Sequence, residues 1–582
     1  MKTTKAIILM LLVLITIVSC VNTKGNSSSS TVIIDDVSKP EKQSISQTLK
    51  ENNHLPIKEQ VALYLKLKKE SPDAYNFENE DELTMYGYSY LWGNEVTEAI
   101  EIFKLIVQQF PNSSNPYDSL GEGYMVNGDN ELAILNYEKS LALNPDNFNA
   151  EDQIERIKNP KKKPATFADK FSKTYTIEDY KEDLDQLGNK LIKVHPNALK
   201  FISEKDFWKT IEQKKALLTE NTTFSEFYWY CSEIIANINC SHTAMSNSFR
   251  DADLLPVSLR FPIQTRWINN QLFVISPLNN KNKVAVRDEI ESINGIGVSE
   301  LIEDIYKHIP SQGHIKTAKR HTFNDFSSKM IPYSLSFPSS YNIKVKGKKD
   351  IIVLNNVKTV KKSFSSSRFK KQCEDDLCLE FLDNNKNAVL TISTFNYYPW
   401  NNLSFYEQFI DESIKEINEN EVENLIIDLR FNGGGSPDAS IHLLKYLIDK
   451  PFNYFLNISN PEKNKVYTNF DTGFKGKLYF IIDGNGESTT GHFMAKVKDL
   501  NLGTIVGEEL GSNQFCTAGQ TILRLSNTKL KFNVANTTSK LTISSLPDEA
   551  GILPDFYITQ NINDYLNKVD AVKEYTIELT EK

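Results

Sequence analysis

The chain is poor in several residue types, and each shortage excludes a class of protein. Among its 582 residues there are six cysteines, and none of their spacings resembles a zinc site. Basic residues are outnumbered, with 66 Lys and Arg against 75 Asp and Glu, so the net charge of −9 argues against a nucleic-acid partner. After the first twenty residues, no apolar run is long enough to cross a membrane. What is left is an acidic chain whose length suits about three to four domains.

The first twenty residues have the pattern of an export signal. Two lysines precede an apolar stretch that is too short to span a bilayer, and the signal ends at Cys20 in a sequence that resembles a bacterial lipobox. We therefore predict a signal peptide at 1–19, lipidation of Cys20, and a location in the cell envelope with membrane attachment through the lipid alone. An ordinary secretory signal with an incidental cysteine is the alternative. Residues 20–48 lack periodicity and are expected to form a flexible tether.

The five cysteines after Cys20 are an odd number, so at least one of them is expected to be a free thiol. Export would permit disulfides. Cys373 and Cys378 are close enough in sequence to close a hairpin loop. The sequence does not fix the pairing.

Residues 49–160 contain an internal repeat with a period of 34 residues. Five pairs match at this spacing: Gly87 with Gly121, Tyr90 with Tyr124, Ala99 with Ala133, Phe103 with Tyr137, and Pro111 with Pro145. The pattern resembles the tetratricopeptide repeat, in which small residues stand where two helices touch. Two repeats make a shallow groove, so we favour a spacer, with a groove for a protein partner as the alternative.

The rest of the chain changes its periodicity twice. Residues 161–250 are predicted to be a helical cap that ends at the polar turn Cys240-Ser241-His242-Thr243. Residues 251–365 alternate apolar and polar residues and are predicted to be mainly β, with a segment at 286–295 that resembles a PDZ-type module. Residues 366–582 are predicted to form an α/β core, with strands at 387–395, 424–430, 477–483 and 503–507 and helices at 403–418, 437–449 and 490–499.

Two strand ends in this core carry residues suited to acyl transfer. The apolar run that begins at Leu425 leads to three glycines, where backbone N–H groups can be open to a ligand. The run that begins at Leu478 leads to Ser488 at the start of a helix. A strand-to-helix turn exposes a nucleophile, and acyl transfer needs oxyanion donors nearby. A plain N-cap role for Ser488 is the alternative.

Across about 165–580 these features resemble the C-terminal (tail-specific) processing family of serine peptidases. The matching segments are Leu425-Ile426-Ile427-Asp428-Leu429-Arg430 with its glycines, the Ser488 turn, Gly507-Glu508, and Gly551-Ile552-Leu553-Pro554-Asp555. The resemblance implies a ClpP/crotonase-like α/β core with a helical cap and a PDZ-like insertion. It also implies a peptide or protein substrate, and no metal or cofactor.

The general base departs from the tail-specific pattern. That branch uses a lysine, and this chain has no lysine between Lys498 and Lys529. The alternative branch, which is similar to the tricorn protease core, uses a histidine on the cap and a glutamate near the C-terminus. His242 and Glu549 match those positions, so the resemblance implies that Ser488 attacks, His242 accepts the proton and Glu549 orients His242.

Other residues are candidates for the base and for the carboxylate that orients it. His492 follows Ser488 by one helical turn and is a second candidate base, although a residue there would usually pack against the sheet. Glu508 and Glu509 are the fallback for Glu549.

The oxyanion donors are expected to be the backbone N–H groups of Gly434 or Gly435 and of Thr489. Asp428 and Arg430 are expected to hold the strand end as an ion pair. The sequence thus predicts a serine peptidase of the cell envelope. A catalytically inactive lipoprotein that binds peptides in the same cleft is the alternative.

Overall fold

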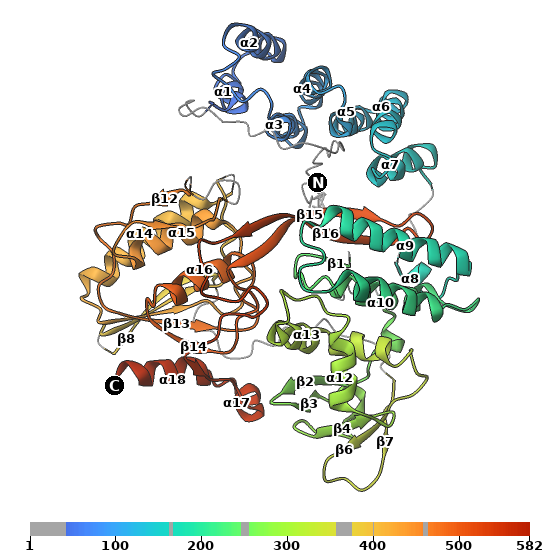
Figure 1. Ribbon diagram of the computed structural model, residues 1–582, viewed down its shortest axis with the longest axis vertical. Coiled ribbons are helices and arrows are strands. Elements are labelled where there is room, and N and C mark those ends of the chain that lie inside the picture. Colours follow the sequence, from blue (N-terminus) through green and yellow to red (C-terminus); the bar gives the residue numbers. More distant parts are fainter. Residues whose placement is uncertain are drawn as a thin grey trace, which may run out of the picture. The chain divides into compact units, whose positions relative to one another are not determined.

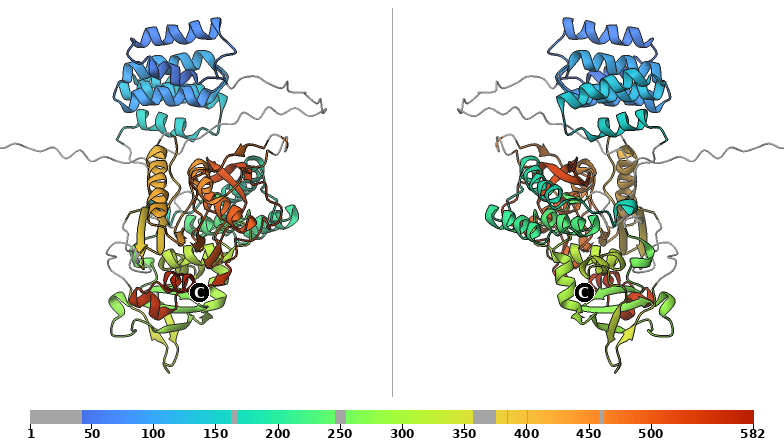
Figure 2. Two further views of the ribbon diagram at one scale, coloured as in Figure 1. Left: turned by 90° about the vertical axis from the view of Figure 1, so that its left-hand side faces the viewer. Right: turned by 90° about the vertical axis from the view of Figure 1, so that its right-hand side faces the viewer.

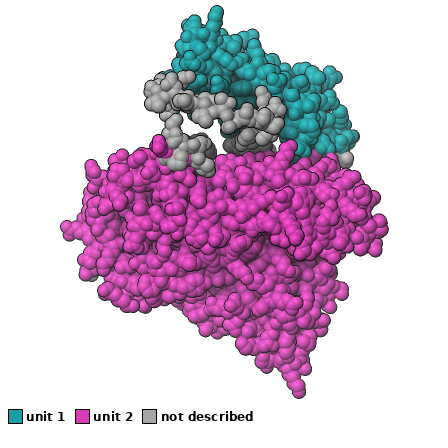
Figure 3. All heavy atoms as spheres, viewed as in Figure 1, with its two compact units in different colours: residues 1–164 teal, residues 165–582 magenta. Residues whose placement is uncertain are grey.

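The computed structural model describes residues 42–161, 167–245, 255–356, 375–383, 385–399, 401–457, 462 and 464–582. The chain divides into two compact units, residues 1–164 and 165–582 (Figure 3). The predicted signal peptide, Cys20, most of the tether and Cys373 lie outside the described residues. Within the described ranges, no helix has the length and apolar character needed to span a membrane.

The described part of the first unit consists of seven helices, which lie side by side in both views of Figure 2. Their bounds are α1 Ile45–Glu51, α2 Ile57–Glu70, α3 Glu80–Trp92, α4 Val96–Gln109, α5 Ser114–Asn127, α6 Asn130–Leu143 and α7 Phe148–Lys158. Glycine allows close contact between neighbouring helices: a Cβ on Gly121 would lie 3.0 Å from the ring of Tyr137. Gly87 meets Phe103 in the same way, one repeat earlier. The tetratricopeptide assignment itself stays a prediction.

The second unit opens with helices α8 (Phe167–Lys170), α9 (Ile177–Val194), α10 (Glu204–Ala216) and α11 (Phe224–Ala236). Two of them begin at a capping box, because Thr176 and Thr223 each exchange hydrogen bonds with the acidic residue three positions on. A short strand, β1 (Ala244–Met245), follows α11 after the turn that contains His242.

The region predicted to be mainly β contains two helices that the sequence pattern did not indicate. Its strands are β2 (Gln264–Ile268), β3 (Gln271–Ser276), β4 (Glu289–Ile293), β5 (Ile296–Gly297), β6 (Asn342–Val345) and β7 (Ile352–Val353), and its helices are α12 (Val298–Tyr306) and α13 (Lys316–Ser334). The prediction was wrong for α13 because this helix is buried on several sides, contains Pro332 and has a kink at Phe326. A helix of that kind lacks the single apolar stripe on which helix prediction relies.

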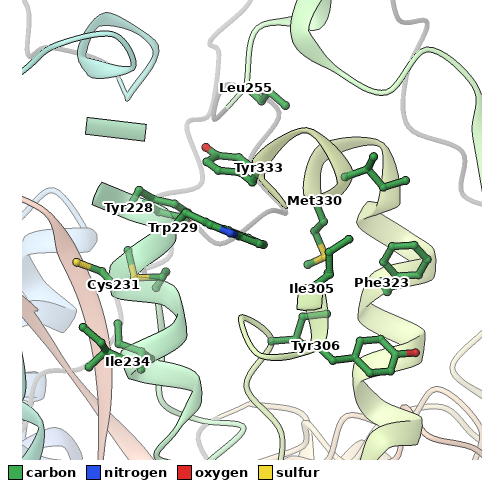
Figure 4. Close-up of a cluster of buried hydrophobic side chains, with 14 of the residues drawn as sticks. Tyr228, Trp229, Cys231, Ile234, Leu255, Ile305, Tyr306, Phe323, Met330 and Tyr333 are labelled. Atoms are coloured by element: carbon green, nitrogen blue, oxygen red, sulfur yellow. The ribbon is translucent and has the colours of Figure 1, made fainter. Parts of the chain in front are cut away.

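One hydrophobic core joins the cap helices to this β region. Trp229 of α11 stacks on Tyr333 of α13, with ring centroids 5.3 Å apart, and Met330 lies beside them (Figure 4). Cys231 belongs to the same buried cluster, and so does Phe532, which comes from a hairpin near the C-terminus. The cap, the β region and that hairpin therefore pack as one body.

The core sheet has the order β17-β14-β13-β10-β9-β8, with every pair parallel except β8 and β9. Its strands are β8 Leu377–Leu382, β9 Asn387–Ile392, β10 Asn424–Asp428, β13 Lys477–Ile482, β14 Thr504–Gly507 and β17 Phe556–Tyr557. The helices are α14 Leu403–Glu419, α15 Pro437–Leu447, α16 Thr489–Asp499, α17 Ile562–Asn567 and α18 Ala571–Thr580. A two-stranded ribbon, β11 (Phe452–Asn453) with β12 (Val466–Tyr467), lies beside them.

Both faces of the parallel strands are buried, as their unbroken apolar sequences predicted. Leu425 and Ile427 point into a cluster shared with α14–α16, whereas Ile426 joins a second cluster with Val572 of α18. Figure 1 shows α18 on the opposite side of the sheet from α14 and α15. The predicted α/β class and the predicted strands and helices of this core are confirmed.

A long hairpin connects the core sheet to the cap. Its strands are β15 (Phe515–Arg524) and β16 (Lys531–Lys540), and β1 pairs with β16, so that Ala244 stands opposite Asn533. Because β1 comes directly after the His242 turn, this three-stranded sheet determines where His242 lies.

Candidate active site

Ser488 occupies a strained turn between β13 and α16. Its backbone angles are φ 54° and ψ −121°, a positive-φ conformation that a serine adopts at an energetic cost. It is the N-cap residue of α16, yet its side chain makes no capping hydrogen bond. The hydroxyl is therefore not used for capping the helix, which disfavours the plain N-cap interpretation.

The glycine loop after β10 is fixed against this turn. The carbonyl oxygen of Asn432 accepts hydrogen bonds from the Glu487 N–H at 3.1 Å and from the Thr490 hydroxyl at 2.9 Å. A Cβ on Gly434 would lie 2.8 Å from Ser488 Cβ and 2.9 Å from the Thr489 nitrogen, and its φ is +91°. Glycine is needed here for both space and backbone conformation.

The two loops place candidate oxyanion donors side by side. The Gly434 N–H donates to Asn432 Oδ1 at 2.9 Å, so it is already engaged. For Gly435 and Thr489, no hydrogen bond from the backbone N–H to an acceptor occurs within the described parts of the chain. The Thr489 hydroxyl donates to the Gly435 carbonyl at 2.5 Å, which holds the two residues together. Of the predicted donors, Gly435 and Thr489 are the pair that this arrangement leaves available.

His242 lies in the turn between α11 and β1, and its backbone is held by the hairpin. Gln520 Nε2 donates to the His242 carbonyl at 2.8 Å, and the next residue, Thr243, accepts from the Ala535 N–H at 3.0 Å. The ring is half-buried. Burial lowers the pKa of His242 from 6.5 to about 4, so the imidazole is neutral near pH 7 and can accept a proton.

Cys516, at the start of β15, lies beside His242. Its Sγ lies 3.8 Å from His242 Nδ1, and burial raises the pKa of the thiol to about 12. Among the described contacts, Ser488 and His242 share no direct hydrogen bond. The structure thus brings His242 to a buried thiol.

Glu549 lies in an exposed loop before Gly551, and its predicted role stays a prediction. Its backbone carbonyl accepts from the His314 N–H at 2.8 Å, and its side chain is exposed at an open groove of about 860 Å³. Within the described residues, no contact joins its carboxylate to His242. The neighbouring Asp548 forms ion pairs with Lys200 at 2.9 Å and Lys540 at 3.2 Å.

The rival base His492 is packed in apolar surroundings. Its ring contacts Tyr454 and Phe455 edge-on, and neither ring nitrogen has a hydrogen-bond partner among the described residues. Burial, together with the nearby His242, lowers its pKa to about 3. These surroundings suit a core residue, as its place one turn into the helix suggested.

The fallback carboxylates are engaged elsewhere. Glu508 is buried and binds Arg320 and His321 of α13. Glu509 accepts from the Gly551 N–H at 3.0 Å. No local pattern connects His321 with Glu508, because they are 187 residues apart.

The ion pair predicted at the end of β10 is confirmed. Arg430 contacts Asp428 at 2.6 Å and also Asp570 at 2.6 Å. The second partner comes from the start of α18 and was not predicted. The burial of Arg430 and Asp428 and their bidentate geometry fix this end of the strand next to the glycine loop.

Sequence reasoning missed Asn432 and Cys516. Asn432 directly precedes the glycines. A polar residue at the end of an apolar motif is the signal that could have identified it. The odd number of cysteines predicts at least one free thiol, and Cys516 is a free thiol, as are Cys231 and Cys240, whereas Cys378 is disulfide-bonded. No local pattern connects Cys516 to a histidine 274 residues away.

Comparison with solved structures finds related chains at low identity. Mature CPAF in complex with lactacystin has 13% identity and a TM-score of 0.48, covering 69% of this chain and 97% of that one. The photosystem II D1 C-terminal processing protease has 13% identity and a TM-score of 0.32, covering 68% and 98%. The tricorn protease has 16% identity and a TM-score of 0.33, covering 69% and 36%. No curated protein matches.

Comparison with family models matches residues 386–558 to peptidase family S41. That segment contains Ser488, the glycine loop, Cys516 and Glu549, whereas His242 lies outside it. The chain therefore carries a serine peptidase domain of family S41, the C-terminal processing peptidase family.

Proposed function

We propose that this protein hydrolyses peptide bonds in the cell envelope, with Ser488 as the nucleophile and His242 as the base. The observation that carries the proposal is the strained turn at Ser488, which is packed against the glycine loop that contains Gly434 and Gly435. A serine hydroxyl that caps no helix, beside two N–H groups without an acceptor in the described chain, is the arrangement that acyl transfer requires.

The reaction follows from these positions. Ser488 Oγ attacks the carbonyl carbon of the substrate while its proton passes to His242, and the carbonyl oxygen becomes negative. The Gly435 and Thr489 N–H groups stabilise that charge. The tetrahedral intermediate then collapses, and protonated His242 gives its proton to the departing amine. Water, activated by the same imidazole, hydrolyses the acyl ester and restores Ser488.

The test is labelling of the purified protein with a fluorophosphonate, which reacts with an activated serine. We expect the wild type to be labelled and to hydrolyse a casein or peptide substrate, and Ser488→Ala to lose both. Ser545→Ala, an exposed serine near the groove, is the matched control and should behave as the wild type. A wild type that resists labelling but binds peptides would instead support the inactive binding protein.

Glu549 stays the predicted third member of the catalytic group. Its exposed carboxylate lacks a described contact with the imidazole, so we test it separately with Glu549→Gln. If Glu549 orients His242 when substrate is bound, kcat should fall while KM changes little. Equal kcat values for Glu549→Gln and the wild type would remove it from the mechanism.

The proposed location depends on the lipobox-like sequence ending at Cys20. Replacing Cys20 with Ser should release the protein from the membrane fraction or leave the signal uncleaved. A Cys20→Ser protein that stays membrane-bound with the same mature mass would contradict lipidation at this cysteine.

A further inference from the structure

The turn that presents Ser488 depends on its surroundings for its conformation. The positive φ of 54° at Ser488 is costly, and such a backbone persists only where neighbouring groups hold it. Residues 483–487 join β13 to this serine, and the end of that segment is held because the Glu487 N–H donates to the Asn432 carbonyl at 3.1 Å. The contacts at the start of the segment therefore bear on how the serine is placed.

Glu508 contacts the start of this segment from the neighbouring strand. β14 pairs with β13 so that Gly507 stands opposite Ile482, and Glu508 directly follows that pair. Its Oε1 accepts a hydrogen bond from the Gly484 N–H at 3.3 Å. Gly484 lies four residues before Ser488, so this bond restrains the backbone that leads to the candidate nucleophile.

The Glu508 carboxylate is in turn held by helix α13 of the β region. Only 6% of the Glu508 surface is exposed, and a buried carboxylate requires charged or hydrogen-bonding partners. Arg320 binds Oε2 and the adjacent His321 binds Oε1. A carboxylate bound at both oxygens has little freedom to rotate, so α13 fixes the direction in which Oε1 meets the Gly484 N–H.

Helix α13 also packs directly on the segment. A Cβ on Gly484 would lie 2.6 Å from His321 Cδ2 and 2.9 Å from Thr317 Cβ, so a larger residue there would displace the helix. The Thr317 hydroxyl donates to Glu509 at 3.5 Å, next to Glu508 in the chain. The β region thus reaches the nucleophile side of the site through one face of α13.

Asp483 holds the same segment in a different direction. Its Oδ1 accepts from the N–H groups of Phe431 and Asn485, each at 3.1 Å. Phe431 follows β10, so these bonds connect the segment to the parallel sheet, whereas those of Glu508 connect it to α13.

We propose that Glu508 is a positioning residue for Ser488, and that Arg320 and His321 keep its carboxylate on the Gly484 N–H. The parallel sheet brings Ser488 to the glycine loop, and α13 sets the final position of the turn. No contact with substrate and no proton transfer is assigned to these side chains. The proposal rests on the proposed function, because it takes Ser488 as the nucleophile.

The kinetic test compares Glu508→Ala with Asn324→Ala. Asn324 lies four residues after Arg320 on α13, but its amide binds the N–H and the carbonyl of Trp267 in β2, at 2.6 Å and 3.0 Å. We expect Glu508→Ala to lower kcat roughly 10²-fold with KM nearly unchanged, because displacing a reacting group by about 1 Å costs on this order. Asn324→Ala, which also loses buried hydrogen bonds, should keep kcat within a few-fold. Thermal melts establish first that both variants are folded at the assay temperature.

A double-variant cycle separates positioning from a general loss of stability. Arg320→Met keeps a long side chain but cannot bind Glu508, and we expect roughly 10-fold loss of kcat. If both residues act through one carboxylate, the double variant should lose no more than Glu508→Ala alone, whereas independent effects would multiply. Multiplied losses would overturn the proposal, and so would a kcat for Glu508→Ala equal to that of Asn324→Ala. If Glu508→Ala does not fold, Arg320→Met and His321→Gln are compared with Asn324→Ala in its place.

Hydrogen exchange measured by mass spectrometry tests the positioning without turnover. Peptides that cover 483–488 should exchange faster in Glu508→Ala and in Arg320→Met than in the wild type, and Asn324→Ala should leave them unchanged. Unchanged exchange at 483–488 in the first two variants would overturn the proposal even if a fluorophosphonate labels the wild type. Faster exchange there would support it even in a protein that resists labelling, so failure of the proposed function can be told apart from failure of this inference.

Discussion

The parallel sheet and the β15–β16 hairpin contribute to the candidate site in different ways. The parallel sheet supplies Ser488 and the glycine loop from neighbouring strands, β10 and β13, which pair in register over five residues. The hairpin supplies Cys516 and positions His242, which comes from the cap. The sheet has its own core on two faces, whereas the hairpin belongs to the core of the cap.

This difference shows that the nucleophile side and the base side of the site are stabilised separately. Parallel strands end at the same edge of a sheet, so the Ser488 turn and the glycine loop meet whenever the sheet forms. His242 reaches that edge only when the cap helices and the hairpin pack together. Damage to either body should therefore affect activity through different residues, and the following experiments test that separation.

The largest effect is expected from His242→Ala, which removes the base while leaving the parallel sheet intact. Hydrolysis should fall on the order of 10³-fold. His492→Leu is the control, because this buried ring faces Tyr454 and Phe455, and its activity should stay within a few-fold. Steady-state kinetics with a peptide substrate measure both. If His492→Leu lost more activity than His242→Ala, the base would be His492, which lies in α16 beside the parallel sheet. The base and the nucleophile would then belong to the same part of the molecule.

Gly434→Ala tests the sheet side of the site. Its Cβ would meet Ser488 and the Thr489 nitrogen, and its φ of +91° is unfavourable for alanine. We expect roughly 10²-fold loss of kcat, as when one oxyanion donor is displaced. Gly433→Ala is matched in sequence, but a Cβ there has open space around it, so it should be nearly silent. Equal losses in the two variants would mean that the loop is sensitive to any side chain.

A pH series separates the roles of the buried histidines. The folded-state pKa of His242 is about 4 and that of His492 is about 3, both below the unfolded value of about 6.5 because burial disfavours the charged ring. Between these values the unfolded chain binds more protons. The contribution of these two neutral histidines to the free energy of unfolding should therefore be fully present above pH 6.5. It should be lost as the pH is lowered towards 4.

Thermal melts from pH 7 to pH 4 measure this loss, and His492→Leu should reduce it. The acid limb of kcat/KM should follow His242 and lie near pH 4 rather than 6.5. A limb near pH 6.5 would show that the ring is solvated when the enzyme works.

The smallest effect is expected from removing the first unit. Because residues 1–164 and 165–582 form separate compact units, a chain beginning at 165 should keep short-peptide turnover within a few-fold. If the helices of the first unit recruit substrate, a protein substrate should lose kcat/KM while a short peptide does not. Circular dichroism shows first whether the truncated chain folds, and failure to fold would contradict the division into independent units.

The sequence predictions were accurate for the parallel sheet and less accurate for the β region that packs against the cap. In the parallel sheet, unbroken apolar runs such as 478–482 indicated strands, and the glycines and Ser488 indicated what their ends could do. In the region predicted to be mainly β, strands β2–β7 are present, but the alternating pattern did not indicate α12 and α13. The position of Glu549 was inferred from a motif, and the structure gives no contact with His242 to support its role.

The sequence by itself determined the parts of this protein whose causes are local. These are the buried parallel strands, the glycine loop that must adopt positive φ, and the serine turn that opens α16. Only the tertiary structure decided that Asn432 joins the two loops and that Cys516 lies beside His242. Contacts across 274 residues leave no local pattern, because they depend on how separately stabilised bodies pack rather than on the conformational preferences of neighbouring residues.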